Sequence, residues 1–470
     1  MKKSLTLLSG PALLLIAVMV LPFTLAQSAA IGTVLWMIVW WSTQVIPIGA
    51  TSLLPLVLFP AFGIADIKAT AGNYANPIIY LFLGGFVLGL AIEKWKLHRR
   101  IALHILRLSG TKPVHVIAGC MGATAILSMW ISNTAATVMM LPIGVSVIGL
   151  LKGQFSLPDV QRRFAVSLLL GLAFAANVGG TATIIGTPPN LVLAGVVGEK
   201  LGYEIGFAQW LGFALPLAAV LFAVILFVNT RLLFRIPSFK MQGIDEMISN
   251  QLAQLGMPKS GERRVGMVFA GMALLWILRA PLSGLPGLSF LSDALIAIAG
   301  AIALFMIRDR EKQALMTWPD MQRMPWDILL LFGGGLSIAM GMSLTGVVAL
   351  VGEAIMEFSH MDWIVLILII TALAVFLTEV MSNVAMVSLL LPVVIGVAPA
   401  LGGDALELAI PLTLGASCAF MLPIATPPNA IVFAGSFLRV KDMVTAGFWL
   451  NLISIALISL YAYLLVPLLF

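Results

Sequence analysis

Long apolar stretches separated by short polar or basic ones run through almost the whole chain, and their lengths predict membrane-spanning helices. The spans expected before the middle of the chain are 1–28, 29–47, 48–63, 77–93 and 207–229. After a polar loop over 230–264, the expected spans are 265–280, 289–307, 326–345 and 447–468. Lys2 and Lys3 before the first apolar run would also suit a signal peptide, but that run is longer than the ~7–15 residues usual for one, which favours a retained helix.

Four further apolar stretches are interrupted by polar residues or prolines. Residues 113–151 and 363–400 each form two apolar arms around a short polar turn, which predicts two re-entrant hairpins that enter and leave the membrane on the same side. Residues 163–197 and 407–437 are long enough to cross, but Asn, Gly and Pro-Pro break them, as in the discontinuous helices of transporters. Interleaved basic and apolar residues over 94–112 predict a helix along the membrane surface.

The polar turns and the breaks carry two repeated motifs. Ser132-Asn133-Thr134 recurs in the second half as Ser382-Asn383-Val384, with a hydroxyl residue upstream of each, Ser128 and Thr378. The second motif, Thr-Pro-Pro-Asn, spans 187–190 and 426–429. Such segments leave backbone groups unpaired, which a membrane tolerates only where they are buried in protein or line a wet cavity. The four stretches therefore predict one binding site built from two halves of the chain.

The composition is that of a polytopic membrane protein. Hydrophobic residues make up 61% of the chain, charged residues 10%, and the mean hydropathy is +1.08. No soluble domain could bury this much apolar surface. The net charge of +6 is explained more simply by orientation in the membrane than by nucleic acid, which is not expected as a partner. Cys120 and Cys418 lie in apolar segments and the four histidines do not cluster, so neither a disulfide nor a metal centre is expected.

The distribution of basic residues gives this arrangement a direction. With the N-terminus in the cytoplasm, every Lys and Arg except Lys68, Lys200 and Arg279 falls on the cytoplasmic side, and the C-terminus lies outside. About eleven spans and two hairpins result. Matching segments around Gly84 and Gly333 then run in opposite directions. The chain thus divides into an inverted-topology pair of repeats, over 29–229 and 265–470, which is the architecture of secondary transporters.

The chemistry of such a site limits its ligands. Carbonyls and hydroxyls suit a small hard cation, whereas amide donors and helix N-termini suit a carboxylate or phosphate oxygen. No Lys or Arg is expected near the bilayer centre, so an anion there needs cations bound beside it. This predicts cation-coupled anion uptake. Glu379, the only acid expected at that depth, either tunes a cation site, carries a proton or is a structural carboxylate.

These motifs resemble the paired motifs of the divalent anion:sodium symporter family, and the similarity extends through 75–85, 130–142 and 417–432 and over nearly the whole predicted layout. The resemblance implies an all-α transporter of the bacterial inner membrane and a homodimer. It also implies an elevator mechanism, in which both hairpins and both broken helices slide against a scaffold. Its expected cargo is di- or tricarboxylates such as succinate, malate, fumarate or citrate, taken up with Na⁺.

The resemblance also implies residue roles. The first sodium site would use Ser128, Ser132, Asn133 and Gly186. The second would use Thr378, Met381, Asn383 and Ala425, and Gly186, Met381 and Ala425 would contribute backbone carbonyls. The substrate-binding positions would be Asn133, Thr134, Thr187, Pro188, Asn383, Val384, Thr426 and Pro427. Val384 stands where the family motif has threonine, and it cannot donate a hydrogen bond, so the preference of the succinate carriers does not transfer directly.

Two alternatives accompany the sodium-coupled carboxylate carrier. A sodium-independent dicarboxylate exchanger, or a carrier of sulfate or another inorganic anion, would share the same architecture. A membrane enzyme or an ion channel is a different class. An enzyme would need a convergent acid, base or nucleophile at depth, where only Glu379 is expected, and a channel has no need of two closed hairpin tips.

Overall fold

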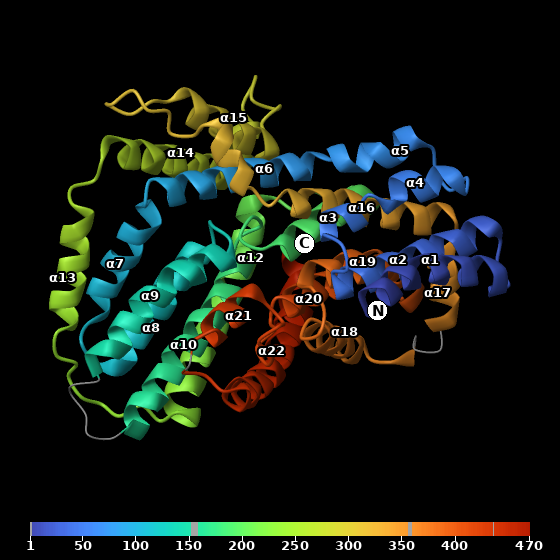
Figure 1. Cartoon of the computed structure of the whole chain (residues 1–470). Coiled ribbons are helices and arrows are strands. Elements are labelled where there is room, and N and C mark those ends of the chain that lie inside the picture. The colour runs from blue at the N-terminus through green and yellow to red at the C-terminus, as the bar shows by residue number, and fades with distance from the viewer. Residues whose placement is uncertain (1, 152–157, 356–359, 436) are drawn as a thin grey trace.

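The computed structural model describes residues 2–151, 158–355, 360–435 and 437–470, and these are overwhelmingly helical (Figure 1). Within these ranges one isolated bridge, between Arg308 and Ala314, is the β-type pairing present. The helices of the first half are α1 (Lys2–Val20), α2 (Leu25–Thr43), α3 (Ile48–Thr51), α4 (Leu54–Ala61), α5 (Ile67–Gly72), α6 (Pro77–Lys94), α7 (Leu97–Ser109), α8 (Pro113–Ser128), α9 (Asn133–Leu151), α10 (Pro158–Thr181), α11 (Pro188–Leu201) and α12 (Phe207–Phe227).

The helices of the second half are α13 (Ile244–Leu255), α14 (Ser260–Ser283), α15 (Asp293–Met306), α16 (Trp326–Leu344), α17 (Val347–Ile355), α18 (Trp363–Leu377), α19 (Asn383–Val397), α20 (Ala405–Ala416), α21 (Pro427–Phe433) and α22 (Val440–Leu469). In this half, the seven helices α16 to α22 follow the order of α6 to α12, and α13 has no counterpart in the first half. Shorter elements are the 3₁₀ turns η1 (Asn73–Ala75), η3 (Trp318–Arg323) and η5 (Ala398–Leu401) and the π-helix η2 (Val228–Leu233).

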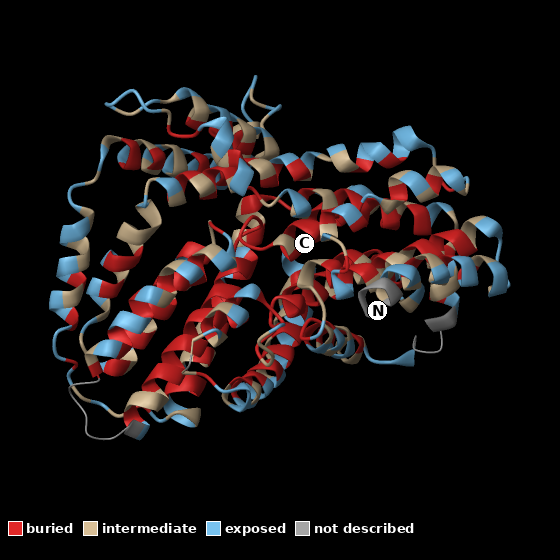
Figure 2. Ribbon diagram, in the orientation of Figure 1, coloured by how far each residue is buried: buried red, intermediate tan, exposed pale blue. Residues whose placement is uncertain are grey.

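The all-α membrane fold expected from the sequence is confirmed. Nine helical stretches among the described residues are long and apolar enough to cross a membrane. Residues 164–181 of α10 are all buried, whereas few residues of α14 are (Figure 2). The apolar surface that α14 leaves uncovered is stable only against lipid or another protein chain, so α14 belongs to the outside of this chain and α10 to its centre.

The two halves are interleaved rather than placed side by side. In each half the first hairpin arm packs on the first part of the broken helix, α8 on α10 and α18 on α20. The second arm also packs on the broken helix of the other half: α9 contacts α21 (Figure 1), and α19 contacts α11. This exchange brings both polar turns and both helix breaks to one place.

Two expectations about the helices need correction. The single span over 48–63 is two short helices, because Pro55 has no N–H to donate to the Thr51 carbonyl and the helix is interrupted there. The polar loop over 230–264 contains α13, an amphipathic helix that buries Ile244 and Ile248 and exposes its polar face.

The re-entrant course of the two hairpins stays a prediction. The stretches Asn133–Leu151 and Asn383–Leu401, which include the second hairpin arms, are each long enough to cross a membrane. Helix length alone therefore does not separate an arm that turns back from one that crosses.

Candidate functional site

The first polar turn holds an asparagine within a cluster of oxygen atoms. Ser132 precedes α9 and caps it, because its Oγ accepts a hydrogen bond from Ala135 N–H at 3.2 Å. The Ser128 hydroxyl, at the end of α8, contacts Asn133 Oδ1 and also lies 2.7 Å from the Ala176 carbonyl oxygen of α10. One hydroxyl proton cannot serve both acceptors at once. The cluster is therefore rich in lone pairs, which favours a small hard cation.

The second polar turn repeats the contacts of the hydroxyl and the asparagine, although Ser382 does not cap α19 as Ser132 caps α9. Thr378 Oγ1 lies 2.7 Å from Asn383 Oδ1 and 2.8 Å from the Ala416 carbonyl oxygen of α20. Asn383 is the first residue of α19, as Asn133 is of α9. The two halves thus carry equivalent oxygen clusters at equivalent helix ends.

The Thr-Pro-Pro-Asn motifs start the second part of each broken helix. A proline pair can begin a helix but not continue one, because proline fixes φ and has no N–H; accordingly α11 starts at Pro188 and α21 at Pro427. The closing asparagines satisfy the carbonyls of the unwound segments. Asn190 Nδ2 donates to the carbonyls of Thr181 (3.1 Å) and Thr183 (2.8 Å). Asn429 does the same for Ala419 (3.0 Å) and Leu422 (3.1 Å).

All four segments line one cavity of about 1300 Å³. Every expected substrate-binding position is part of this lining: Asn133, Thr134, Thr187, Pro188, Asn383, Val384, Thr426 and Pro427. Of the expected cation ligands, Ser132, Gly186, Met381 and Ala425 also line it. Ser128 and Thr378 do not, but they lie directly behind the two asparagines through the contacts above. The N-termini of α9, α11 and α19 all open on the cavity, so their dipoles favour an anion there.

Two glycines allow the first break to close around the first turn. A Cβ at Gly180 would lie 2.4 Å from Asn133 Oδ1. A Cβ at Gly186 would lie 2.5 Å from the Gly180 carbonyl oxygen and 3.0 Å from that of Ser128. A side chain at Gly180 or Gly186 would therefore collide with oxygen atoms of the first turn and the first break.

Asn177 is a cavity residue that the sequence indicated only as an interruption of an apolar helix. Its Nδ2 donates to Thr426 Oγ1 at 3.3 Å and lies 3.5 Å from the Ala419 carbonyl oxygen. Asn177 belongs to α10 and Thr426 to the second break, so this hydrogen bond joins the two halves. An amide in the middle of an apolar run was the sequence signal that could have placed Asn177 in the site, because a buried amide needs hydrogen-bond partners.

Glu379 is buried and fully engaged with protein donors. Its Oε1 accepts hydrogen bonds from the backbone N–H groups of Phe420 and Met421, each at 2.8 Å, and from Asn451 Nδ2 at 2.8 Å. Its Oε2 accepts one from Leu422 N–H at 2.9 Å. Four donors on one carboxylate favour the structural alternative, in which Glu379 holds the unwound segment between α20 and α21 against the second hairpin.

The cavity is not free of protein cations, which corrects the sequence expectation. Arg323, the last residue of η3, lines it together with Glu93 and His98. The cavity extends from the two polar turns to the ends of α6 and α16, where charged residues are accommodated. Arg323 Nη2 pairs with Glu93 Oε2 at 2.9 Å. Burial lowers the pKa of His98, which disfavours the charged form of its imidazole.

Interleaved helical repeats, two broken helices and a polar cavity between facing helix ends define a membrane transporter. The comparisons identify which one. The profile of the family described as "Sodium:sulfate symporter transmembrane region" matches residues 3–470. The chain therefore belongs to this family, and it is a transporter, not an enzyme.

Curated relatives and solved structures agree with this assignment. The sodium-dependent dicarboxylate transporter SdcS of Staphylococcus saprophyticus is 37% identical over 471 residues, covering 98% of this chain and 91% of the relative. SdcS of Staphylococcus aureus (strain USA300) is 38% identical over 441 residues, covering 92% and 85%. Two solved structures share the fold. The YdaH transporter of Alcanivorax borkumensis aligns with a TM-score of 0.56 and 16% identity, over 93% of this chain and 98% of its own. MtrF of Neisseria gonorrhoeae aligns with a TM-score of 0.58 and 14% identity, over 85% of this chain and 84% of its own.

Proposed function

We propose that this protein carries di- or tricarboxylates, such as succinate, malate, fumarate or citrate, across the bacterial inner membrane together with Na⁺. One observation carries the proposal. The two asparagines of the repeated motif, each at the start of a helix and each beside a hydroxyl and a backbone carbonyl, line the same cavity. Each asparagine offers an oxygen to a cation and an N–H group to a carboxylate.

Charge explains why the cargo would need sodium. Among the described lining residues, Arg323 is the one with a permanent positive charge, and Glu93 cancels it. A dicarboxylate bound between the polar turns would bring two negative charges that the cavity wall does not offset. Cations in the oxygen clusters would offset them, so the binding of each ion would favour the binding of the other. The relatives named as sodium-dependent dicarboxylate transporters support this assignment.

We assign the ions to the two clusters by position. The first sodium ion would bind among Ser128, Ser132, Asn133 and Gly186, and the glycine would contribute its backbone carbonyl. The second would bind among Thr378, Met381, Asn383 and Ala425. The carboxylates would lie between them, against Asn133, Thr134, Thr187 and Pro188 on one side and Asn383, Val384, Thr426 and Pro427 on the other.

The motion and assembly of the protein belong to the same proposal. The hairpins 113–151 and 363–400 and the two broken helices would form a transport domain that slides as an elevator against the remaining spans, in a homodimer embedded in lipid. With the N-terminus cytoplasmic and the C-terminus periplasmic, Glu93, His98 and Arg323 would lie at the cytoplasmic mouth of the cavity. This conformation would then be the one that releases cargo into the cell.

Transport by purified protein in liposomes tests the proposal. An inward sodium gradient should drive labelled succinate to a concentration above that outside. If succinate counterflow occurs at the same rate with and without sodium, the protein is a dicarboxylate exchanger instead. Sodium-driven uptake of sulfate, with no competition from carboxylates, would support the inorganic-anion carrier that the family description also suggests. A competition panel of succinate, malate, fumarate, citrate and sulfate ranks the cargo.

A further inference from the structure

Arg323 lines the central cavity from an element that carries neither repeated motif. Its side chain is 67% exposed, although it pairs with Glu93, which is only 19% exposed. A guanidinium has five N–H donors. Within the described part of the chain, the bond to Glu93 at 2.9 Å is the one hydrogen bond that its side chain makes. Several donors of Arg323 are therefore free to bind an oxygen ligand in the cavity.

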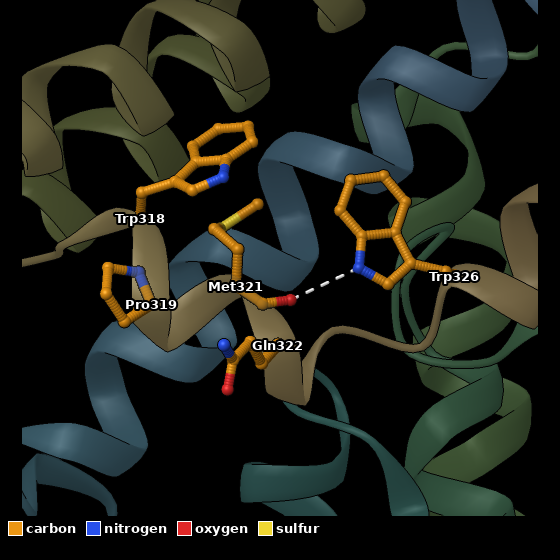
Figure 3. Close-up of a pocket in the computed structure, with 5 residues that line it drawn as sticks. All are labelled: Trp318, Pro319, Met321, Gln322 and Trp326. Carbon is orange, nitrogen blue, oxygen red and sulfur yellow. Dashed lines mark hydrogen bonds between the residues drawn. The ribbon is translucent and has the colours of Figure 1, made fainter.

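The backbone that carries Arg323 is firmly held. Thr317 and Asp320 form a capping box at the start of η3. At its end, the Trp326 indole N–H donates to the Met321 carbonyl at 3.2 Å, across a shallow pocket of about 210 Å³ (Figure 3). Met321 and Met324 are both buried. The backbone of Arg323 is thus already in place before a ligand binds, and only the side chain needs to move to reach the ligand.

A second ion pair joins the same two elements and serves as an internal comparison. Lys94 Nζ lies 2.7 Å from Asp320 Oδ2, so it also connects the end of α6 to η3. Neither residue lines the cavity. The Lys94–Asp320 pair can fix η3 but cannot meet an anion in the cavity, whereas the Arg323–Glu93 pair can do both.

We propose that Arg323 captures the anionic cargo at the mouth of the cavity, exchanging the carboxylate of Glu93 for a carboxylate of the cargo as it enters or leaves. The proposal rests on the proposed function in requiring an anionic cargo, and it adds a residue outside the repeated motifs. The planar guanidinium matches a carboxylate with two parallel hydrogen bonds. Because one carboxylate replaces another, the exchange is nearly balanced, and the cargo is steered without being trapped.

Opposite substitutions of the pair give the test. The assay measures the KM for labelled succinate in everted membrane vesicles, which present the Arg323 side outward, at low and high ionic strength. Arg323→Gln should raise KM about three- to tenfold with little change in Vmax, and should flatten its dependence on salt. Arg323→Lys keeps the charge, so its KM should lie between those of the wild type and Arg323→Gln. Glu93→Gln frees Arg323 and should lower KM.

A purely structural pair predicts a different pattern. Replacing either Arg323 or Glu93 would then change KM in the same direction. Lys94→Gln, the matched control, would change KM in that direction as well. The proposal is overturned if Glu93→Gln raises KM as Arg323→Gln does, or if Arg323→Gln keeps the salt dependence of the wild type. Wild-type vesicles that transport neither succinate nor sulfate would overturn the proposed function and this inference together. Anion transport that ignores Arg323→Gln overturns the inference alone.

Discussion

Asn177 and Thr426 are joined by a hydrogen bond of 3.3 Å between Nδ2 and Oγ1, which links the two broken helices across the pseudo-symmetric interface of the protein. The asparagine comes from the first half and the threonine from the second. Both line the cavity. The two half-sites are therefore one physical unit, in which a ligand held by one half touches groups fixed by the other.

A single site that both halves of the chain form predicts that transport needs the asparagine of each half. We expect Asn133→Ala and Asn383→Ala each to lower sodium-driven succinate uptake at least about 100-fold, because each would remove one proposed cation ligand and one proposed hydrogen-bond donor to the anion, each worth ~1.5–3 kcal/mol. Uptake into proteoliposomes measures this. Asn73→Ala is the matched control, since Asn73 is also a buried amide, bonded to Ser337 Oγ at 3.2 Å outside the cavity. An uptake rate of half the wild-type value in either Asn133→Ala or Asn383→Ala would contradict a single site formed by both halves.

The close packing of oxygen atoms around Gly186 predicts the effect of a second substitution. A methyl group on Gly186 would lie 2.5 Å from the Gly180 carbonyl oxygen and 3.0 Å from that of Ser128, so it would displace oxygen atoms next to the proposed cation site. We expect Gly186→Ala to raise the sodium concentration for half-maximal uptake at least about tenfold, with a smaller change in succinate KM at saturating sodium. Gly149→Ala is the control, because nothing lies within 4 Å of its Cβ position. It should stabilise α9 by up to ~1 kcal/mol and leave transport unchanged. Equal sodium curves for both mutants would show that no ion binds beside Gly186.

The centre of the site was predictable from sequence for a specific physical reason. Asparagines and proline pairs inside apolar runs interrupt the helix and leave carbonyls that must find donors within the protein, and the repetition of these motifs indicated which parts meet. Asn190 and Asn429 show this directly, since each donates to two carbonyls of its own unwound segment. The helix order followed from the lengths of the apolar runs.

Other parts of the site carry no such local signal. Arg323 lies in a polar connection whose sequence resembles any surface loop, and only the tertiary fold places it in the cavity lining. The partners of Glu379 come from residues 420–422 and 451, far along the chain. The burial of Ile244 and Ile248, which turns a predicted loop into α13, likewise depends on what packs against it.

The four hydrogen bonds of Glu379 predict a role in positioning. Glu379→Gln would place an amide N–H₂ against backbone N–H donors, which we expect to cost about 2–4 kcal/mol of stability. Melting of the detergent-purified protein measures the loss. The dependence of uptake on pH should keep its wild-type shape, because the carboxylate serves as an acceptor and not as a proton carrier.

A comparable carboxylate provides the control for Glu379. Glu407 lies on α20 and accepts a hydrogen bond from the indole of Trp363, the first residue of α18. Its replacement by Gln keeps an acceptor for that single donor, so Glu407→Gln should melt close to the wild type. A changed pH profile in Glu379→Gln, with an unchanged melting temperature, would instead identify Glu379 as a titrating transport residue.

Val384 and Thr134 occupy equivalent positions in the two turns, and both line the cavity. Adding a hydroxyl with Val384→Thr should change the ratio of succinate to citrate or sulfate uptake several-fold, because one neutral hydrogen bond contributes about 0.5–1.5 kcal/mol. Thr134→Val, which removes a hydroxyl from the opposite turn, should also change the ratio. Val138→Thr is the matched control, because Val138 lines the same cavity from within α9 rather than at its start. If all three mutants rank the anions as the wild type does, neither turn position contacts the cargo. If Val138→Thr changes the ranking as much as Val384→Thr does, general polarity of the cavity wall, and not the turn position, sets the selectivity.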